Sequence, residues 1–442
     1  MKNTDASLAL VQVNHLNTGQ KTSAVVGTIG LGILLFAWAA QKVSMPGIML
    51  TLALLCIAIG VLGYAHYTYK DSPAGIKNNG VMFRSLSNRG LWAYIVGVLL
   101  TGFYVCLYWY ADYLKGLIQL FDPLSQLARH RPADQWFVYG SLYTLGVLIL
   151  GAKFMYKYRH NRYQIIRTAS VMFFQFIFAW LVPAWMQMMN QPDFYFTYFW
   201  PLKYEYLFPS TVNWLTNSTH LGIFLIFWGV AMTFIATPVL TYFYGKRWYC
   251  SWVCGCGALA ETTGDSFRTL SDKSLKAWKI ERYLIYSVLV FIVLLTILLW
   301  VNSYHQGAVL GKWSQNTSKV YSFFIGSMFS GVIGTGFYPI LGNRTWCRFG
   351  CPQAAILGII QKYFSRFRIT TNGGQCIGCG NCSTHCEMGI DVKAYAQRGQ
   401  DIVRASCVGC GICSAVCPRG VLRLENGSVD IFDRASLTRN DH

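Results

Sequence analysis

Two cysteine runs near the carboxyl end constrain the fold of this chain more than any other feature. Both have the spacing C-x2-C-x2-C-x3-C; the first holds Cys376, Cys379, Cys382 and Cys386, the second Cys407, Cys410, Cys413 and Cys417. Bacterial ferredoxins use this spacing to bind [4Fe–4S] clusters, in which each iron takes one thiolate. Three closely spaced cysteines supply three ligands, and the fourth comes from the other run.

This rule predicts two clusters with crossed ligand sets. The first takes Cys376, Cys379, Cys382 and Cys417, and the second takes Cys407, Cys410, Cys413 and Cys386. A disulfide framework and a zinc ribbon are the alternatives, but zinc usually takes its ligands as two separated pairs rather than as two runs of four. Because such clusters mostly carry electrons, the pattern predicts an electron-transfer protein.

The composition adds a membrane portion. The chain has 442 residues, of which 54% are hydrophobic and only 12% charged, whereas a soluble protein carries about 25% charged residues. Several apolar stretches reach the roughly 20 residues that cross a bilayer as a helix. The predicted fold class is therefore mainly α: a polytopic α-helical membrane protein of about eight spans with a small C-terminal α+β two-cluster ferredoxin domain.

The expected spans divide the chain into four parts. They cover residues 24–41, 47–65, 91–111, 136–155, 166–186, 220–243, 282–301 and 319–341. Residues 1–218 form an N-terminal membrane domain of about five spans, and 219–360 form a second membrane domain of about three. The ferredoxin domain covers 361–425, and 426–442 is a tail. The basic segment 361–375 is expected to lie along an anionic membrane surface.

The formal net charge of +19 would suggest a nucleic-acid partner in a soluble protein. We expect none here, because lysine and arginine crowd the cytoplasmic loops of membrane proteins. Segments 156–167 and 244–280 are rich in these residues, and 187–219 and 302–318 are poor in them. This bias places both termini and the ferredoxin domain on the cytoplasmic side of a bacterial inner membrane, where the reducing compartment suits thiolate ligands.

An aromatic-rich segment, 193–210, falls on the outside in this topology. One interpretation is an aromatic belt or an interfacial helix at the membrane surface. The other is a docking surface for a partner or a quinone site.

Five further cysteines follow the sixth and eighth expected spans: Cys250, Cys254 and Cys256, then Cys347 and Cys351. Both spans run inward in this topology, so the two C-x3-C pairs lie at the same membrane edge. The spacing i, i+4 would place both thiols of a pair on one helix face. Four thiolates suffice for a third iron–sulfur centre or a soft metal; reduced packed thiols or a disulfide pair are the alternatives.

The order and spacing of these cysteines resemble the NapH/NosR/CcoG family of membrane polyferredoxins. The resemblance covers roughly residues 219–425, and the segment 344–352 around Cys347 and Cys351 matches well. It implies electron transfer between the quinone pool, cytoplasmic clusters and a periplasmic redox enzyme or its maturation. The chain departs from the pattern at Gly255 and Glu387, where proline is expected, and at the additional Cys256.

Other cofactors find little support in the sequence. None of the eight histidines lies near the middle of an expected span, so an internal haem b is not expected. There is no flavin-attachment motif of the kind found in NosR relatives, so covalent flavin is not expected either. Glu261 and Asp265 are interpreted as caps of a short amphipathic helix, and no catalytic residue is assigned.

Three functions fit the sequence. The first is an electron-transfer subunit, of quinol-dehydrogenase type, between the quinone pool or a cytoplasmic donor and a partner redox subunit or periplasmic metalloenzyme. The second is a redox factor for assembly of a metallocentre such as copper. The third is a structural or relay subunit of a larger respiratory complex. Whether the chain is itself an enzyme, and whether it forms a homodimer, are left open.

Overall fold

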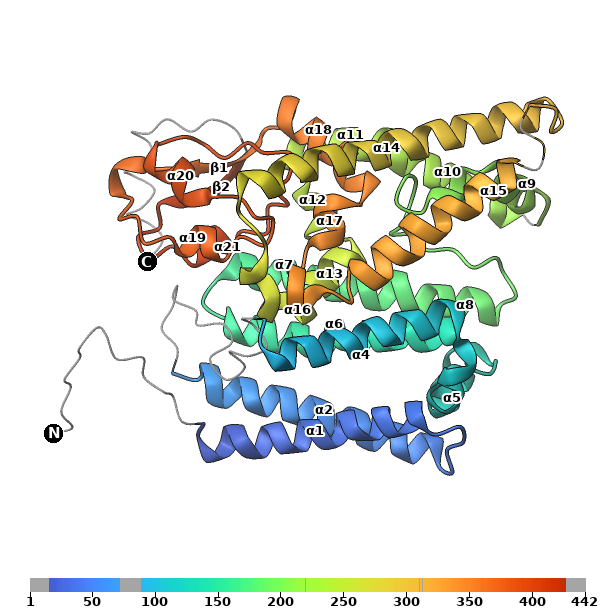
Figure 1. Ribbon diagram of the computed structural model, residues 1–442, viewed down its shortest axis with the longest axis horizontal. Helices are drawn as coiled ribbons and strands as arrows, with labels where there is room; N and C mark the ends of the chain where they lie inside the picture. The colour runs from blue at the N-terminus through green and yellow to red at the C-terminus, as the bar shows by residue number, and fades with distance from the viewer. Residues whose placement is uncertain (1–15, 72–88, 219, 310, 312, 427–442) are drawn as a thin grey trace.

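The molecule is a bundle of long helices with a small cysteine-rich part at one end (Figure 1). The computed structural model describes all residues except 1–15, 72–88, 219, 310, 312 and 427–442. The predicted tail therefore lies outside the described residues except for Asn426, which ends a strand.

Among the described residues, seven helices are long and apolar enough to cross a membrane. They are α1 (Thr18–Ala39), α2 (Pro46–Tyr69), α4 (Leu91–Trp109), α6 (Gln135–Lys157), the continuous run of α7 (Arg162–Phe173), η2 (Phe174–Leu181) and α8 (Val182–Met188), the run of α10 (His220–Ala231), η4 (Met232–Ala236) and α11 (Thr237–Tyr244), and α14 (Leu275–Tyr304). Only 17% to 39% of the most apolar part of each is buried in the protein. So much outward apolar surface fits a membrane protein.

The eighth expected span, 319–341, is not among these seven. The helix there begins earlier and ends earlier, as α15 (Trp313–Tyr321) continued by the π-helical η6 (Ser322–Ile333). Polar residues such as Ser314, Thr317 and Lys319 occupy its first turns, and the glycine-rich segment from Gly334 ends it. It nevertheless runs back across the bundle beside α14 and returns the chain to the ferredoxin end (Figure 1).

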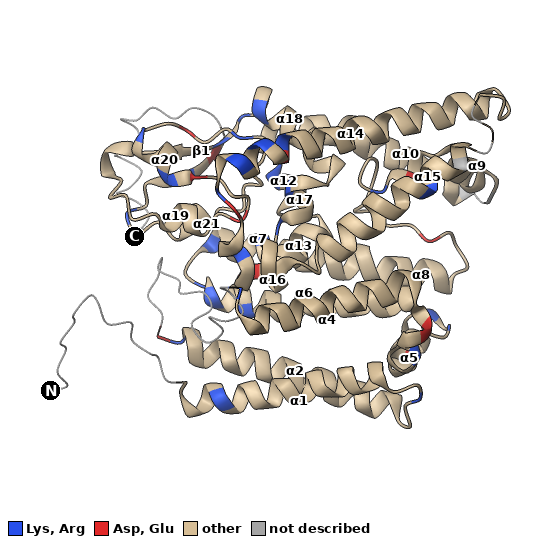
Figure 2. Cartoon of the chain, in the orientation of Figure 1, with Lys and Arg blue, Asp and Glu red and all other residues tan. Residues whose placement is uncertain are grey.

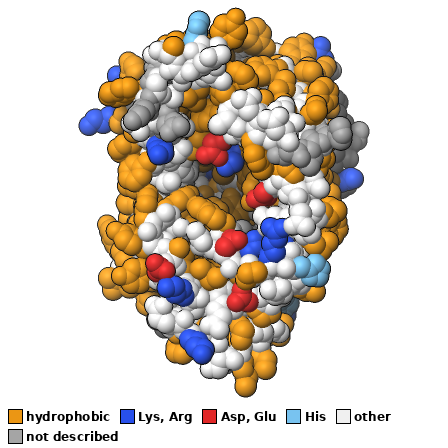
Figure 3. Space-filling view, turned by 90° about the vertical axis from the view of Figure 1, so that its right-hand side faces the viewer, with side chains coloured by type: hydrophobic (Ala, Val, Ile, Leu, Met, Phe, Trp, Pro, Cys, Tyr) orange, Lys and Arg blue, Asp and Glu red, His pale blue; other side chains and the backbone are white. Residues whose placement is uncertain are grey.

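Short elements connect the long helices. At the end away from the ferredoxin part lie η1 (Ala111–Leu114), α5 (Lys115–Arg129), η3 (Tyr204–Leu207) and α9 (Pro209–Ser218) (Figure 1). At the other end lie α12 (Arg247–Cys250), α13 (Gly255–Thr262), η5 (Thr263–Leu270), α16 (Tyr338–Leu341), α17 (Thr345–Phe349) and α18 (Pro352–Tyr363). Figure 3 looks onto the first of these ends, where charged side chains surround a central hollow and hydrophobic ones cover the flanks.

The ferredoxin part has the expected α+β character. Its strands β1 (Phe367–Thr371) and β2 (Leu422–Asn426) pair antiparallel, with Phe367 opposite Asn426. Between them lie η7 (Gly373–Gln375), α19 (Asn381–Thr384), α20 (Val392–Gln397) and α21 (Ile412–Ala415). Gly380 and Gly411, with φ of +78° and +74°, precede the two helical stubs α19 and α21. Glycine alone adopts this conformation readily, so each stub can follow its cysteine loop without strain.

The aromatic side chains of segment 193–210 are packed inside the protein and do not form an exposed belt. Phe194 and Phe199 are 2% and 0% exposed. The hydroxyl of Tyr249 donates to the carbonyl of Thr197 at 2.7 Å, and the Phe199 and Tyr249 ring centres are 5.0 Å apart. The segment therefore folds back into the bundle and reaches the residue next to Cys250.

Candidate iron–sulfur sites

The thiols predicted to bind the first cluster converge on one cavity. It is lined by Cys376, Cys379, Cys382 and Cys417 together with residues of α19 and α20. Cys379 is exposed, as is the neighbouring Ile377. Burial raises the pKa of Cys382 to about 11. This thiol therefore keeps its proton until a metal displaces it, as expected of a ligand whose ionisation is coupled to metal binding.

The second predicted set lies deeper, against the bundle. Cys407 and Cys413 are buried, while Cys410 and Cys386 are half-buried. Burial, and then the neighbouring thiols of Cys410, Cys407 and Cys386, raise the pKa of Cys413 well above its usual value. The four thiols are thus close enough to affect one another. Their soft donor atoms and the repeated glycine turns fit a [4Fe–4S] cluster at each of the two sites.

Side chains from the membrane portion hold the backbone of the second run. Four consecutive carbonyls each accept a hydrogen bond: Cys407 from Gln361, Val408 from Ser251, Gly409 from Tyr163 and Cys410 from Gln164, all at 2.8 Å. These donors come from α7, the loop after α12, and α18. The backbone of the second cysteine run is therefore docked on the bundle.

The five membrane-edge cysteines also come together, but each pair is not on one helix. Cys250 ends α12 and Cys254 precedes α13; Cys347 lies in α17 and Cys351 precedes α18. The predicted single helix face was therefore wrong, because the chain turns between the two cysteines of each pair. Burial raises the pKa of the Cys351 thiol, as do the nearby thiols of Cys347, Cys250 and Cys254. None of the fifteen cysteines forms a disulfide in the structure.

The departure at Gly255 has a structural reason. A Cβ atom added there would meet the hydroxyl of Tyr198 and lie 2.6 Å from Oε1 of Gln175. Tyr198 belongs to the segment that folds back into the bundle, so its hydroxyl takes the space a larger residue would fill. A hydrogen bond from Cys256, the additional cysteine, lowers the pKa of the Cys254 thiol.

A buried network of charged side chains joins all these elements. Its members are Lys157, Arg167, Glu261, Asp265, Arg268, Arg344 and Glu387. Glu387, which replaces the expected proline, accepts from Arg268 at 2.9 Å and from Arg344 at 3.0 Å. Arg344 also lies 3.7 Å from the sulfur of Cys347. One guanidinium thus connects a membrane-edge thiol with the residue after Cys386.

The network corrects the interpretation of Glu261 and Asp265 as helix caps. Glu261 pairs with Arg167 and Arg344, and Asp265 with Lys157 at 2.6 Å and Arg268 at 3.2 Å. Burial alone would raise the pKa of Asp265, but the two cations outweigh it and hold the pKa well below its usual value. Glu261, Glu387 and Cys410 approach one another closely enough to bind a metal; the arginines already pair with both carboxylates.

Known family models match the three cysteine-bearing regions. A 4Fe-4S dicluster domain matches residues 375–422, and a 4Fe-4S binding domain matches 225–274 and 323–371. The second match contains all five membrane-edge cysteines. The matching model is described as a 4Fe-4S binding domain, whereas the spacing of these cysteines alone left several alternatives.

Several curated proteins are similar to part of the chain. YccM of Escherichia coli, named as an electron transport protein, is 28% identical over 162 residues, which are 34% of this chain and 44% of YccM. The methylamine utilization ferredoxin-type protein MauN of Methylobacillus flagellatus is 28% identical over 160 residues, 34% of this chain and 53% of MauN. The chain therefore spans about half the length of these relatives. No solved structure matches it significantly.

The chain fits a family of membrane polyferredoxins. Ferredoxin domains, relatives named for electron transport and several apolar helices together support this assignment. Its 4Fe-4S domains mark it as an iron–sulfur protein. The network around Arg344 and Glu387 was missed by sequence reasoning. Three acids close to cysteines in an acid-poor chain, Glu261, Asp265 and Glu387, were the available signal.

Proposed function

We propose that this polyferredoxin relays electrons between its two ferredoxin clusters and a third iron–sulfur centre held by the membrane-edge cysteines. The clusters supply one-electron redox chemistry. The chain supplies a fixed alignment of the three sites. Its N-terminal helices, α1 to α8, give it membrane anchorage and pack against the cysteine-bearing helices.

The contact between the second ferredoxin run and the membrane-edge cysteines carries this proposal. Ser251, directly after Cys250, donates to the carbonyl of Val408 at 2.8 Å. On the other side, Arg344 contacts both Cys347 and Glu387. Residues beside the membrane-edge cysteines thus contact residues beside Cys407 and Cys386, which favours electron transfer between the two groups.

The first cluster site marks the other end of the relay. Its exposed rim at Ile377 and Cys379 suits a soluble donor or acceptor. We place this end in the cytoplasm of a bacterial cell and the bundle in the inner membrane, where the quinone pool and a partner redox subunit or periplasmic metalloenzyme would exchange electrons with it. Figure 2 shows lysine and arginine concentrated at the ferredoxin end of the bundle, which supports this orientation.

Electron exchange with quinone tests the proposed function. The protein is purified anaerobically, reduced with dithionite, freed of reductant and mixed with a soluble naphthoquinone while cluster absorbance is followed. We expect rapid reoxidation in the wild type and a rate equal to the uncatalysed background in Cys347→Ser, Cys351→Ser. Equal rates in the two proteins would contradict a role for the membrane-edge cysteines.

The five grouped thiols also favour a second candidate, a redox factor for copper insertion. Thiolates are soft ligands that select Cu(I). Competition between the protein and a Cu(I) chelator distinguishes the two functions. Tight copper binding that Cys347→Ser removes, in protein whose iron content stays constant, would favour metallocentre assembly over electron relay.

A further inference from the structure

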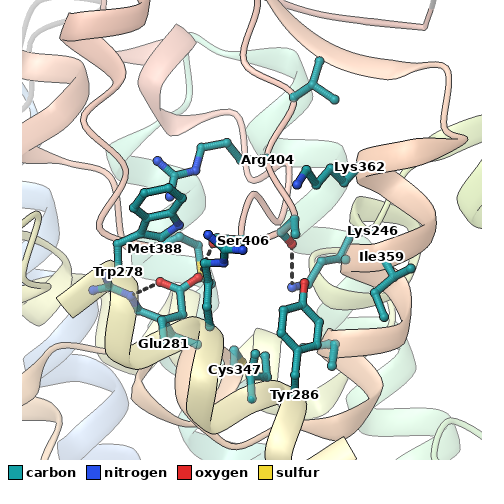
Figure 4. A pocket seen from close by; sticks show the side chains of 18 of the residues that line it. Lys246, Trp278, Glu281, Tyr286, Cys347, Ile359, Lys362, Met388, Arg404 and Ser406 are labelled. Carbon is teal, nitrogen blue, oxygen red and sulfur yellow. Dashed lines mark hydrogen bonds and ion pairs between the residues drawn. The ribbon is translucent and has the colours of Figure 1, made fainter. Parts of the chain in front are cut away.

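A basic cavity of about 480 Å³ lies between the bundle and the ferredoxin part. Trp278, Arg282 and Tyr286 of α14 line it, as do Lys362 of α18 and the segment 403–406 of the ferredoxin part. Figure 4 shows an open centre with Arg404 and Lys362 on one side and Cys347 and Tyr286 on the other. The cavity therefore adjoins the membrane-edge cysteines but is formed mainly by other residues.

The lining carries an excess of positive charge. Five basic side chains, those of Lys246, Arg282, Arg348, Lys362 and Arg404, face a single carboxylate, that of Glu281. Within the described part of the chain, only Arg348 of these five forms an ion pair, at 2.7 Å to Glu281. Five grouped cations facing one carboxylate create a positive potential in the cavity, so the cavity favours an anionic occupant.

Uncharged partners already hold these cations in place. The guanidinium carbons of Arg282 and Arg404 lie 5.4 Å and 4.6 Å from the ring centre of Trp278. Nζ of Lys246 donates to the carbonyl of Ala405 at 3.2 Å. Such contacts orient the donors without neutralising them. Two arginines with fork-shaped donor sets are well suited to a phosphate group.

The cavity opens where the lipid-facing surface of α14 begins. Tyr283, directly after Arg282, is 78% exposed, and the exposed apolar face continues along the helix through Leu284, Val290 and Leu294. Tyr363 and Phe364 at the end of α18 are also exposed. Ile285 and Ile359 add apolar walls inside the cavity. Charged donors therefore adjoin an apolar surface, as an amphipathic ligand requires.

We propose that this cavity binds the phosphate headgroup of an anionic phospholipid from the leaflet at the ferredoxin end. Basic pockets between membrane helices bind such headgroups. A quinone headgroup is neutral and would leave the cations uncompensated. The bound lipid would hold segment 403–406 against α14 and close the cavity over Cys347. The basic segment at 361–375 thus contributes Lys362 to a defined site rather than only lying on the membrane surface.

Native mass spectrometry of the full-length protein in detergent tests this site. Dioleoyl phosphatidylglycerol, dioleoyl phosphatidylcholine or inorganic phosphate is added to delipidated wild type, Arg282→Gln/Arg404→Gln and the matched control Lys276→Gln/Lys279→Gln. The control removes the same charge from exposed positions of α14 outside the cavity. Lys362→Gln, at an exposed position, serves as a second cavity variant. Iron content is measured in each protein to verify that its clusters are intact.

We expect the wild type and the control to retain phosphatidylglycerol equally and the double cavity variant to retain it about tenfold less, or about 1.4 kcal/mol in affinity. Lys362→Gln should show a smaller loss. An equal loss of phosphatidylglycerol retention in the control would show that basic residues anywhere on the surface attract the lipid, and it would overturn the proposal. Equal retention of phosphatidylcholine would overturn it too, as would competition by equimolar inorganic phosphate, which would indicate a free-phosphate site.

Discussion

At the residue scale, the cysteine groups are enclosed by side chains that fit one another closely. Gly255 is the clearest case, because Tyr198 and Gln175 occupy the space where its side chain would stand. The glycine and the tyrosine are far apart in sequence, and the reason for the missing proline appears only when the segment around Tyr198 folds back into the bundle.

Gly255→Ala should therefore destabilise the protein by about 1–3 kcal/mol, as overpacking does in other cores. Thermal unfolding monitored by tryptophan fluorescence measures this loss. Adding Tyr198→Phe to Gly255→Ala removes the hydroxyl that the new methyl group meets. The double variant should therefore recover part of the lost stability. Gly32→Ala, where no atom lies within 4 Å, is the control and should change little. If Gly32→Ala lost as much stability as Gly255→Ala, the close fit at Gly255 would not explain the loss.

The ion pairs of Asp265 predict that the stability of the protein depends on pH. Lys157 and Arg268 hold its pKa below the ordinary value of 3.8, so the stabilisation is complete above about pH 4 and is lost as the pH falls through the lowered pKa. Asp265→Asn should cost about 3–5 kcal/mol at neutral pH, because it leaves buried charge uncompensated. The difference from wild type, followed by thermal unfolding, should shrink below about pH 4. A pH-independent difference would refute this explanation.

The matched control is Asp112→Asn. Asp112 pairs with Lys115 at 2.9 Å, but both side chains are exposed. Surface pairs contribute about 0–1 kcal/mol, so this variant should unfold close to wild type at every pH.

At the element scale, α18 connects the membrane portion with the ferredoxin part. Oε1 of Gln361 accepts from the backbone of Lys246 at 2.7 Å, and its Nε2 donates to the carbonyls of Arg404 and Cys407 at 2.7 and 2.8 Å. This single side chain joins the start of α12, the segment that lines the basic cavity and the second cysteine run.

Gln361→Ala should loosen this junction. It leaves buried backbone groups unpaired, at a cost of about 1–3 kcal/mol each. Hydrogen exchange in residues 404–411 should accelerate, while exchange in α6 stays unchanged. Gln400→Ala, at an exposed position of the ferredoxin part, is the control. Unchanged protection in 404–411 would mean that Gln361 does not hold the junction.

At the scale of the whole molecule, the features that follow local patterns could be predicted from sequence. Cysteine spacing indicated the ferredoxin part, and hydropathy indicated seven helices that the structure contains. The contacts of Arg344 with Cys347 and Glu387, and of Tyr198 with Gly255, join residues distant in sequence. Neither cysteine spacing nor hydrophobic periodicity indicates contacts between residues so far apart in sequence. The expected helix face for each C-x3-C pair failed because a turn, not a helix, separates the cysteines.

Orientation in the membrane gives another whole-molecule prediction. With basic residues concentrated at the ferredoxin end (Figure 2), that end should stay in the cytoplasm. A green fluorescent protein fused after His442 should fluoresce, and alkaline phosphatase fused at the same position should be inactive. Active phosphatase would reverse the proposed topology.

Iron and acid-labile sulfide content tests the central claim, a relay of three iron–sulfur centres, most directly. Anaerobically purified wild type and Cys347→Ser, Cys351→Ser are compared, with electron paramagnetic resonance spectra of each after reduction. The account predicts about twelve irons per wild-type chain and about eight in the variant, four for each cluster, with one spectral component lost. About eight irons in both proteins, with identical spectra, would confine the clusters to the ferredoxin part and contradict it.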